Sequence, residues 1–228
     1  MIRFTQPASM TAEFIAAISY CAVEKLKNFR DYPVSSRYYI DMQIERATAI
    51  NYLVPLANRE HRALDELLTR LRKLKYEKYE FFSGEYGHAD GYFLGTTRPL
   101  IMTSDNDEKW NIGRYTIKVP VQGVLNRSLE TFKMRPIVPD VEILHAYHPH
   151  HTSNHTCWSE WSQSLTEACA NCHFDRIFGT FLGFLQSYYP GSPLARPPER
   201  GEVRDPGTDM YWMVQLNQEE VKSIVLRR

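Results

Sequence analysis

The sequence lacks the features of exported and membrane-spanning chains. Its N-terminus, MIRFTQPASM, has no apolar core of the kind that a signal peptide requires, and no later run approaches the roughly 18 consecutive apolar residues of a transmembrane helix. Only four cysteines occur among 228 residues, too few for a disulfide-stabilised scaffold, so we expect thiols. These absences predict a cytoplasmic protein without a membrane partner.

Net charge is lacking as well, because the 27 basic and 27 acidic residues cancel. Non-specific binding to nucleic acid relies on excess positive charge near the phosphates, so no nucleic-acid partner is expected. By contrast, the hydrophobic fraction of 43% is large enough to fill a substantial core. A chain of this length fits one domain with an appendage or two small domains.

Helical periodicity dominates the N-terminal third of the chain. Apolar residues recur at helical spacing after Ser9, which can cap a helix, until the sequence DYP at 31–33 interrupts the pattern. A second helix is predicted from about residue 36 to 52, and a third, with a stripe of leucines, after Pro55.

Runs of β-branched and aromatic residues follow and predict three strands. These runs are GYFLGTTRPLIMTS (91–104), GRYTIKVPVQG (113–123) and PDVEILHAYH (139–148), with turn residues between them. Compact connections favour an antiparallel meander. Helical spacing then returns and ends at YYPGSP, and the segregation of strands from helices predicts an α+β fold with helices packed on one sheet.

Two neighbouring stretches concentrate the residues that could carry chemistry. YHPHHTSNHTCWSEW (147–161) contains four histidines and a cysteine, and CANCH (169–173) follows it. CANCH matches the C-x-x-C-H pattern of covalent haem attachment. Covalent haem attachment normally accompanies export, however, and no export signal is present. In addition, apolar residues recur around the motif at the spacing of a packed helix.

Zinc is a second interpretation, with tetrahedral thiolate and imidazole ligands. The candidate ligands are Cys157, Cys169, Cys172 and His173, with His150 or His155. Against zinc, Cys169 and Cys172 fall three residues apart on a predicted helix, where a buried cysteine behaves as a small hydrophobic residue.

A single nucleophile, Cys157, is the third interpretation. The thiolate is the reactive form of cysteine, and nearby cationic groups lower the thiol pKa. Flanked by His151 and His155, Cys157 has the ingredients for attack on an activated carbonyl. Judged on composition alone, a lone cysteine beside histidines is more often inert than catalytic.

The order of the elements resembles the ubiquitin-conjugating enzyme fold. In FLGTTRPL…GRYTIKVPV…PDVEILHAYHPHHTSNHTCW…W…L…YYPGSP, strands lead into a His-Pro tripeptide, and a cysteine, a tryptophan, a helix and a proline-containing turn follow. The variant tripeptide HPH, with tryptophan directly after the cysteine, is similar to the divergent ubiquitin-conjugating-like (UBC-like) proteins of bacteria and phages. The resemblance covers about residues 85–195. It leaves 1–84 as an N-terminal helical region and 196–228 as a proline-rich connector with a C-terminal strand and helix.

The resemblance implies a role for each residue of the loop. Cys157 would accept the C-terminus of a ubiquitin-like protein as a thioester and pass it to an amine. His150 stands where the family has an asparagine linked to oxyanion stabilisation, and its ring N–H could donate a hydrogen bond, although imidazole titrates near pH 6.5. His151 and His155 would lower the thiol pKa or accept a proton from the amine.

The remaining loop residues would be structural. His148 and Pro149 would hold the turn after the last strand, and Trp161 would pack beneath the loop. Such a site needs no cofactor and no metal.

Two functions of a UBC-like fold therefore remain open on the sequence, beside the alternative of a zinc-stabilised small domain. If the chain is catalytic, its partners are a ubiquitin-like protein and the enzyme that activates it. Otherwise it is a UBC-like binding or assembly module whose partners are other copies of the chain or other protein subunits.

Overall fold

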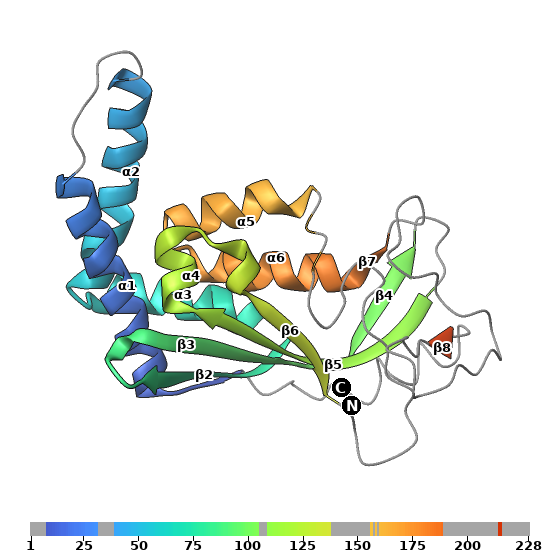
Figure 1. Cartoon of the computed structure of the whole chain (residues 1–228). Helices are drawn as coiled ribbons and strands as arrows, with labels where there is room; N and C mark the ends of the chain where they lie inside the picture. Colours follow the sequence, from blue (N-terminus) through green and yellow to red (C-terminus); the bar gives the residue numbers. More distant parts are fainter. Residues whose placement is uncertain are drawn as a thin grey trace.

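The computed structural model describes residues 8–31, 39–104, 109–137, 156, 158, 160–188 and 214–215 (Figure 1). Three helices precede most of the sheet, and two follow it, in agreement with the predicted α+β class. The helices are α1 (Ala12–Asp31), α2 (Tyr39–Ala57), α3 (His61–Lys73), α4 (Val121–Asn126), α5 (Trp161–Ala170) and α6 (Phe174–Gln186), with a 3₁₀ turn at Leu129–Thr131. The strands are β1 (Ser9–Met10), β2 (Tyr76–Gly84), β3 (Gly87–Thr97), β4 (Leu100–Ser104), β5 (Lys109–Pro120), β6 (Lys133–Ile137), β7 (Ser187–Tyr188) and β8 (Val214–Gln215).

A long antiparallel hairpin forms the centre of the sheet. Strands β3 and β4 pair with β5 along its length, from Tyr92 opposite Pro120 to Thr103 opposite Lys109. The ladder is interrupted around Pro99, which has no N–H to donate. The predicted strands are thereby confirmed in part: 91–104 is divided between β3 and β4, and 113–123 is a strand only as far as Pro120, where α4 follows. The predicted strand 139–148 lies outside the described residues.

Two strands that the sequence did not reveal complete a meander. β2 pairs antiparallel with β3, and β6 pairs antiparallel with the other side of β5. In chain order, β2, β3, β5 and β6 are therefore neighbours. Short strands extend this sheet: β1 runs parallel to β2, β7 runs parallel to β4, and β8 pairs with the far end of β5. The sheet is mixed but mostly antiparallel.

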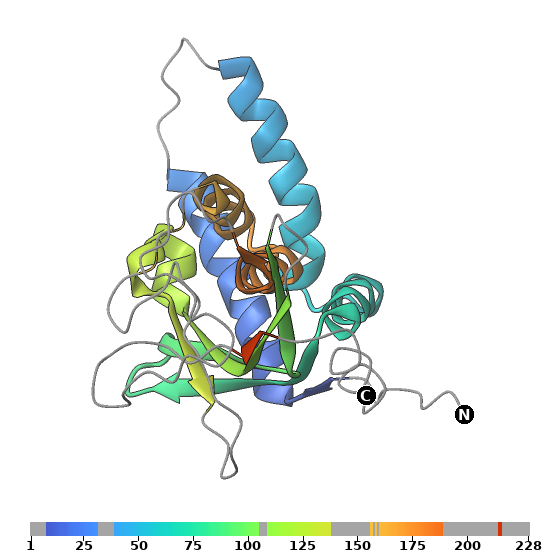
Figure 2. The ribbon, with the colours of Figure 1, turned by 90° about the vertical axis from the view of Figure 1, so that its right-hand side faces the viewer.

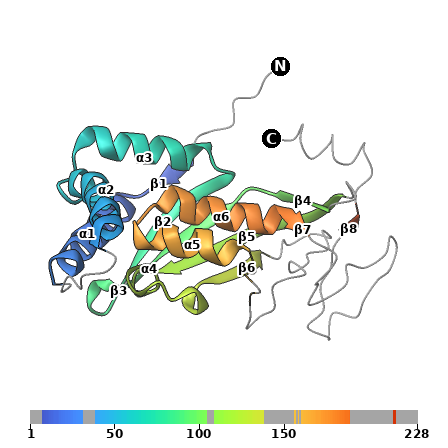
Figure 3. The same cartoon turned by 90° about the horizontal axis from the view of Figure 1, so that it is seen from above.

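Helices cover one face of the meander (Figure 2). α5 and α6 lie side by side over the strands when the molecule is viewed from above (Figure 3). The core between them is aromatic: the ring of Phe178 in α6 lies 5.3 Å from that of Tyr76 and 5.1 Å from that of Tyr79. Phe14 in α1 joins the cluster edge-on to Phe93 of β3, at 5.3 Å.

The N-terminal helices share this core with the strands. Phe14 and Ile18 of α1 are fully buried, as are Leu67 and Leu71 of α3. The predicted boundary between residues 84 and 85 falls in the turn of the β2–β3 hairpin. None of the described helices is long and apolar enough to cross a bilayer.

Replacing Tyr76 with phenylalanine tests how the sheet holds α6. The Tyr76 hydroxyl donates a 2.9 Å hydrogen bond to the carbonyl of Phe178, and both groups are buried. Tyr76→Phe removes the donor and leaves a buried carbonyl without it, so the free energy of unfolding should fall by about 1–3 kcal/mol in urea titrations.

Tyr86→Phe is the matched control, because the side chain of Tyr86 is 82% exposed and its hydroxyl can bond to water. It should leave the free energy of unfolding within about 0.5 kcal/mol of the original protein. Equal stability of the two variants would show that the hydrogen bond from Tyr76 does not hold α6.

Candidate functional site

The predicted active-site loop lies largely outside the described residues. His148, Pro149, His150, His151, His155 and Cys157 all belong to that part of the chain. The structure does describe both ends of the segment that carries them. The segment leaves the sheet at the end of β6, and it returns at Trp158 and at Trp161, the first residue of α5.

Two tryptophans attach the returning end of this segment to α6. The ring of Trp158 lies 5.3 Å from that of Phe181 and 5.1 Å from that of Phe184. The backbone N–H of Trp161 donates to the carbonyl of Trp158 at 2.8 Å, which closes a turn at the start of α5. Trp158, the residue that follows Cys157 in the sequence, is thereby held against α6.

Gly183 makes room for the second tryptophan. A Cβ atom on Gly183 would lie 2.8 Å from Cη2 and Cζ3 of Trp161, closer than carbon atoms approach one another. The absence of a side chain there lets the indole rest directly on the backbone of α6. Trp161 therefore packs on α6, whereas the loop that it was expected to underlie lies outside the described residues.

A pair of glycine substitutions in α6 tests the tryptophan contact. Gly183→Ala should displace the indole of Trp161, whereas at Gly179 the new Cβ would meet only Leu74 Cδ2, at an ordinary 3.8 Å. Alanine favours a helix over glycine by about 0.5–1 kcal/mol, so Gly179→Ala should stabilise the protein. Gly183→Ala should be about 1–3 kcal/mol less stable than Gly179→Ala because of overpacking.

Urea unfolding followed by tryptophan fluorescence measures both effects. The emission of the folded Gly183→Ala protein should also differ from that of the Gly179→Ala protein. If both alanines stabilise equally and leave the emission unchanged, Trp161 does not depend on Gly183.

The CANCH motif forms a helix end. The predicted continuous helix is wrong at this point, because α5 stops at Ala170 and α6 begins at Phe174. Cys172 adopts a left-handed conformation with φ of 51°. The N–H of His173 bonds to the carbonyl of Ala168 at 2.9 Å and that of Cys172 to the carbonyl of Cys169 at 3.3 Å, the hydrogen-bond pattern of a Schellman motif.

Both cysteines of the motif face the protein interior. Cys169 and Cys172 are fully buried, and the Cys172 thiol lies 3.8 Å from the carbonyl oxygen of Cys21 in α1. Burial raises the pKa of the Cys169 and Cys172 thiols to about 12, and it raises the pKa of Cys21 as well. These three side chains are therefore neutral thiols at neutral pH.

This environment does not suit the haem interpretation. No three histidine, cysteine, aspartate or glutamate side chains within the described residues are grouped so that they could hold an ion, and the other candidate zinc ligands, Cys157, His150 and His155, lie outside those residues. Covalent haem would need both thiols of CANCH at its edge, yet the surrounding core encloses them completely. Cys169 and Cys172 act as core residues.

Lys25 is a buried charged residue that the sequence did not reveal. It lies one turn after Cys21 on the apolar side of α1, and its ammonium donates a 2.7 Å hydrogen bond to the carbonyl of Leu125 at the end of α4. Burial lowers the pKa of Lys25. The bond joins α1 to α4 and satisfies a carbonyl that has no partner within its own helix.

His173, the last residue of the CANCH motif, packs against α2. Its ring lies 4.2 Å from the ring of Tyr52 in α2, edge to face, and burial lowers its pKa. Beside it, Arg70 of α3 forms a 2.7 Å ion pair with Asp175 of α6. These contacts fasten α2 and α3 to the beginning of α6.

Alkylation of the native protein distinguishes the buried cysteines from Cys157. A rise in thiol pKa from 9.0 to about 12 lowers the reactive thiolate fraction at pH 8 roughly a thousandfold. Iodoacetamide should therefore modify Cys21, Cys169 and Cys172 only after denaturation. If Cys157 is a nucleophile, it should be the cysteine modified in the native protein, and peptide mass spectrometry identifies the site.

Cys157→Ser supplies the control, because it should abolish the labelling of the native protein and leave Cys21, Cys169 and Cys172 to be labelled after denaturation. Labelling of Cys169 or Cys172 at the rate of Cys157 would contradict the buried positions of these two thiols.

No protein-family model, no curated protein and no solved structure matches this chain.

Proposed function

We propose that the chain is a divergent UBC-like protein that accepts a ubiquitin-like modifier as a thioester on Cys157 and passes it to an amine. The observation that supports this proposal is the position of the Cys157 segment in the chain, between the strands of the meander and the helices α5 and α6. A four-stranded antiparallel meander, β2-β3-β5-β6, leads into the segment with the HPH tripeptide and Cys157. Trp161 then begins a pair of helices that pack on the same sheet.

The meander begins earlier than the sequence pattern indicated. The resemblance was carried by strands from about residue 91, whereas the paired strands start at Tyr76 in β2. β6 is the last described strand before the tripeptide. The proposed UBC-like domain, placed at residues 85–195 on the sequence, would therefore also include β2.

The proposed reaction is acyl transfer between sulfur and nitrogen. The Cys157 thiolate attacks the carbonyl carbon of the thioester that joins the modifier to its activating enzyme, and the enzyme's cysteine leaves as a thiolate. An acceptor amine then attacks the new thioester, Cys157 leaves as a thiolate, and the amine gives up a proton. Because the acyl group arrives already activated, the site needs positioning and an oxyanion donor more than strong acid–base groups.

Three histidines of the loop are assigned to these needs. His150 would donate a ring N–H to the developing oxyanion, and His151 or His155 would stabilise the thiolate or take the proton from the amine. His148 and Pro149 would shape the turn that precedes them. These roles rest on the order of the residues in the loop.

A binding or assembly module without catalysis is the second candidate. The observation that favours it is the position of α2, which extends well beyond the sheet and the other helices (Figures 1 and 2). A helix that projects in this way can pack against another copy of the chain or against a different subunit. The same fold would then serve as a scaffold.

A thioester assay tests the first function. Incubation with ATP, a candidate activating enzyme and its ubiquitin-like protein should produce an adduct that thiol reagents release. Cys157→Ser should give a thiol-resistant ester or no adduct, since serine oxygen forms an ester where sulfur forms a thioester. Cys169→Ala is the matched control, because Cys169 is a buried core residue and its loss should leave the adduct.

Substitutions of His150 then address the oxyanion. His150→Asn should transfer the modifier to an amine at close to the original rate, and His150→Ala should be about 10–100-fold slower because the donor is lost. An adduct on a cysteine other than Cys157 would refute the proposal. If no adduct forms with any modifier and light scattering finds a stable oligomer, the module without catalysis is the function.

A further inference from the structure

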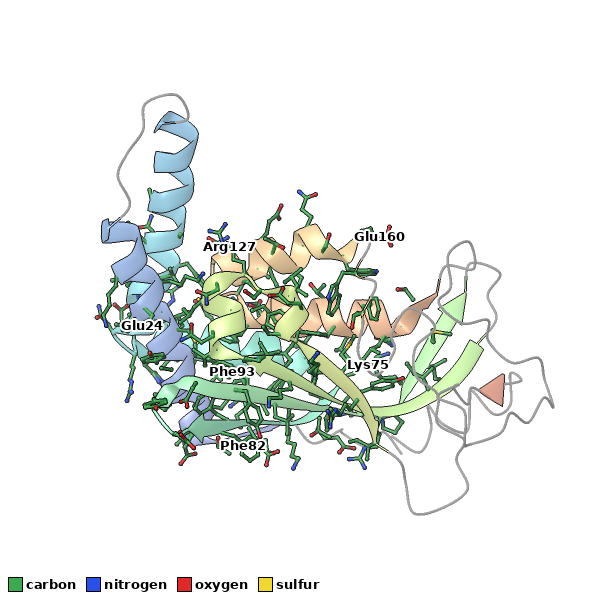
Figure 4. The ribbon with its side chains drawn as sticks, viewed as in Figure 1. Glu24, Lys75, Phe82, Phe93, Arg127 and Glu160 are labelled. Atoms are coloured by element: carbon green, nitrogen blue, oxygen red, sulfur yellow. The ribbon has the colours of Figure 1, made fainter. Side chains whose placement is uncertain are left out.

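The meander has a second face, on the side opposite the helices. Side chains alternate between the two faces of a strand, and those of the second face are exposed or half-buried. Five residues of this second face form a surface that we name the outer sheet face: Phe82 of β2, Tyr92 of β3, Lys118 of β5, and Lys133 and Arg135 of β6. Phe82 points away from the helices, and Phe93 lies on their side (Figure 4). None of the described helices covers the outer sheet face (Figures 2 and 4).

An aromatic pair forms one part of this surface. The rings of Phe82 and Tyr92 stack at 5.2 Å with an angle of 18° between them. The ammonium of Lys118 lies 3.9 Å from the centre of the Tyr92 ring. Since β2 and β5 flank β3 on opposite sides, Phe82 and Lys118 approach Tyr92 from opposite sides. Phe82 remains 41% exposed.

Cations form the other part, and two of them face each other. Lys118 and Lys133 are direct partners in the β5–β6 ladder, on the same face of the sheet. Like charges directly opposite one another destabilise a sheet. Arg135 lies two residues after Lys133 on this face. Within the described part of the chain, none of these three side chains forms an ion pair.

Glu80, which lies in line with Lys118 and Lys133 across the strands, already has a cationic partner. Glu80 of β2 forms a 2.9 Å ion pair with Lys78, and β3 stands between Glu80 and Lys118. The described protein therefore holds a repulsive pair of lysines beside an exposed aromatic ring and supplies no anion to it.

We propose that the outer sheet face docks an acidic segment of another protein. Carboxylates of the partner contact Lys118, Lys133 and Arg135, and an apolar side chain of the partner covers Phe82. Single-stranded nucleic acid fits less well, because bases stack on open aromatic faces and the Tyr92 ring is already flanked on both sides. The proposal does not involve residues 138–159, so it stands whether or not Cys157 is catalytic.

A fluorescent peptide in which glutamates flank a central leucine is the probe. Fluorescence anisotropy should show saturable binding that weakens as salt is added. Lys133→Glu should weaken binding at least tenfold, and Phe82→Ser should weaken it without changing its salt dependence. Lys73→Glu makes the same charge change at an exposed position of α3, and binding should stay within about twofold of the original protein.

Stability supplies a second signature of the same site. Lys133→Glu replaces a like-charge pair with an opposite-charge pair, so the melting temperature should rise by about 1–3 °C while peptide binding is lost. A gain in stability together with a loss of binding separates a docking surface from simple damage to the fold.

Three results would overturn the proposal. They are peptide binding that Lys133→Glu leaves unchanged, the absence of saturable binding by the original protein, and tighter binding of an oligothymidylate than of the peptide. The last result would assign the surface to nucleic acid.

Discussion

The packing of α6 on the sheet is the contact on which the other described contacts depend. Phe178 of α6 enters a cluster with Tyr76 and Tyr79 of β2, and the hydroxyl of Tyr76 holds the backbone of α6 at 2.9 Å. The helix can approach this closely because β3 has a glycine beneath it: a Cβ on Gly95 would lie 2.7 Å from the Tyr76 ring and 2.8 Å from the Phe178 ring. The aromatic rings thus occupy the volume that a side chain at Gly95 would need.

The position of α6 in turn determines where the cysteine-bearing segment re-enters the fold. Phe181 and Phe184 of α6 receive Trp158, and Gly183 receives Trp161. The other end of the segment is held by the pairing of β6 with β5. Packed elements of the fold therefore hold both ends of the segment, whereas the cysteines of the CANCH motif are fully buried in the core.

The spacing of apolar residues in the sequence was sufficient to predict those helices and strands whose apolar residues all face one core. The helices around Phe14, Leu67 and Phe181 and the long hairpin are of this kind. β2 escaped prediction because a register shift between Tyr76 and Lys78 breaks its alternation, so that the buried Tyr76 and Tyr79 stand three residues apart. β6 is five residues long and contains a proline, which weakens any strand pattern.

Other features depend on contacts between distant residues and had no local signal. The carbonyl of Leu125 that accepts the Lys25 ammonium is one hundred residues away along the chain. The left-handed turn at Cys172 occurs at a residue type that seldom adopts it, so the sequence favoured one long helix there. The environment of Cys157 could be assigned only by resemblance, since its loop lies outside the described residues.

The opposition of Lys118 and Lys133 also follows from distant pairing, and the core prevents the sheet from relieving it. Met134, between Lys133 and Arg135, is buried opposite Ile117 on the helix side of the sheet. A slip of β6 by one residue would separate the lysines, but it would also turn Met134 to solvent and drive its charged neighbours into the core. The burial of Met134 therefore opposes the one-residue slip that would separate the two lysines. The two lysines therefore stay opposite one another in the folded chain, and the carboxylates of the proposed partner would reduce their repulsion.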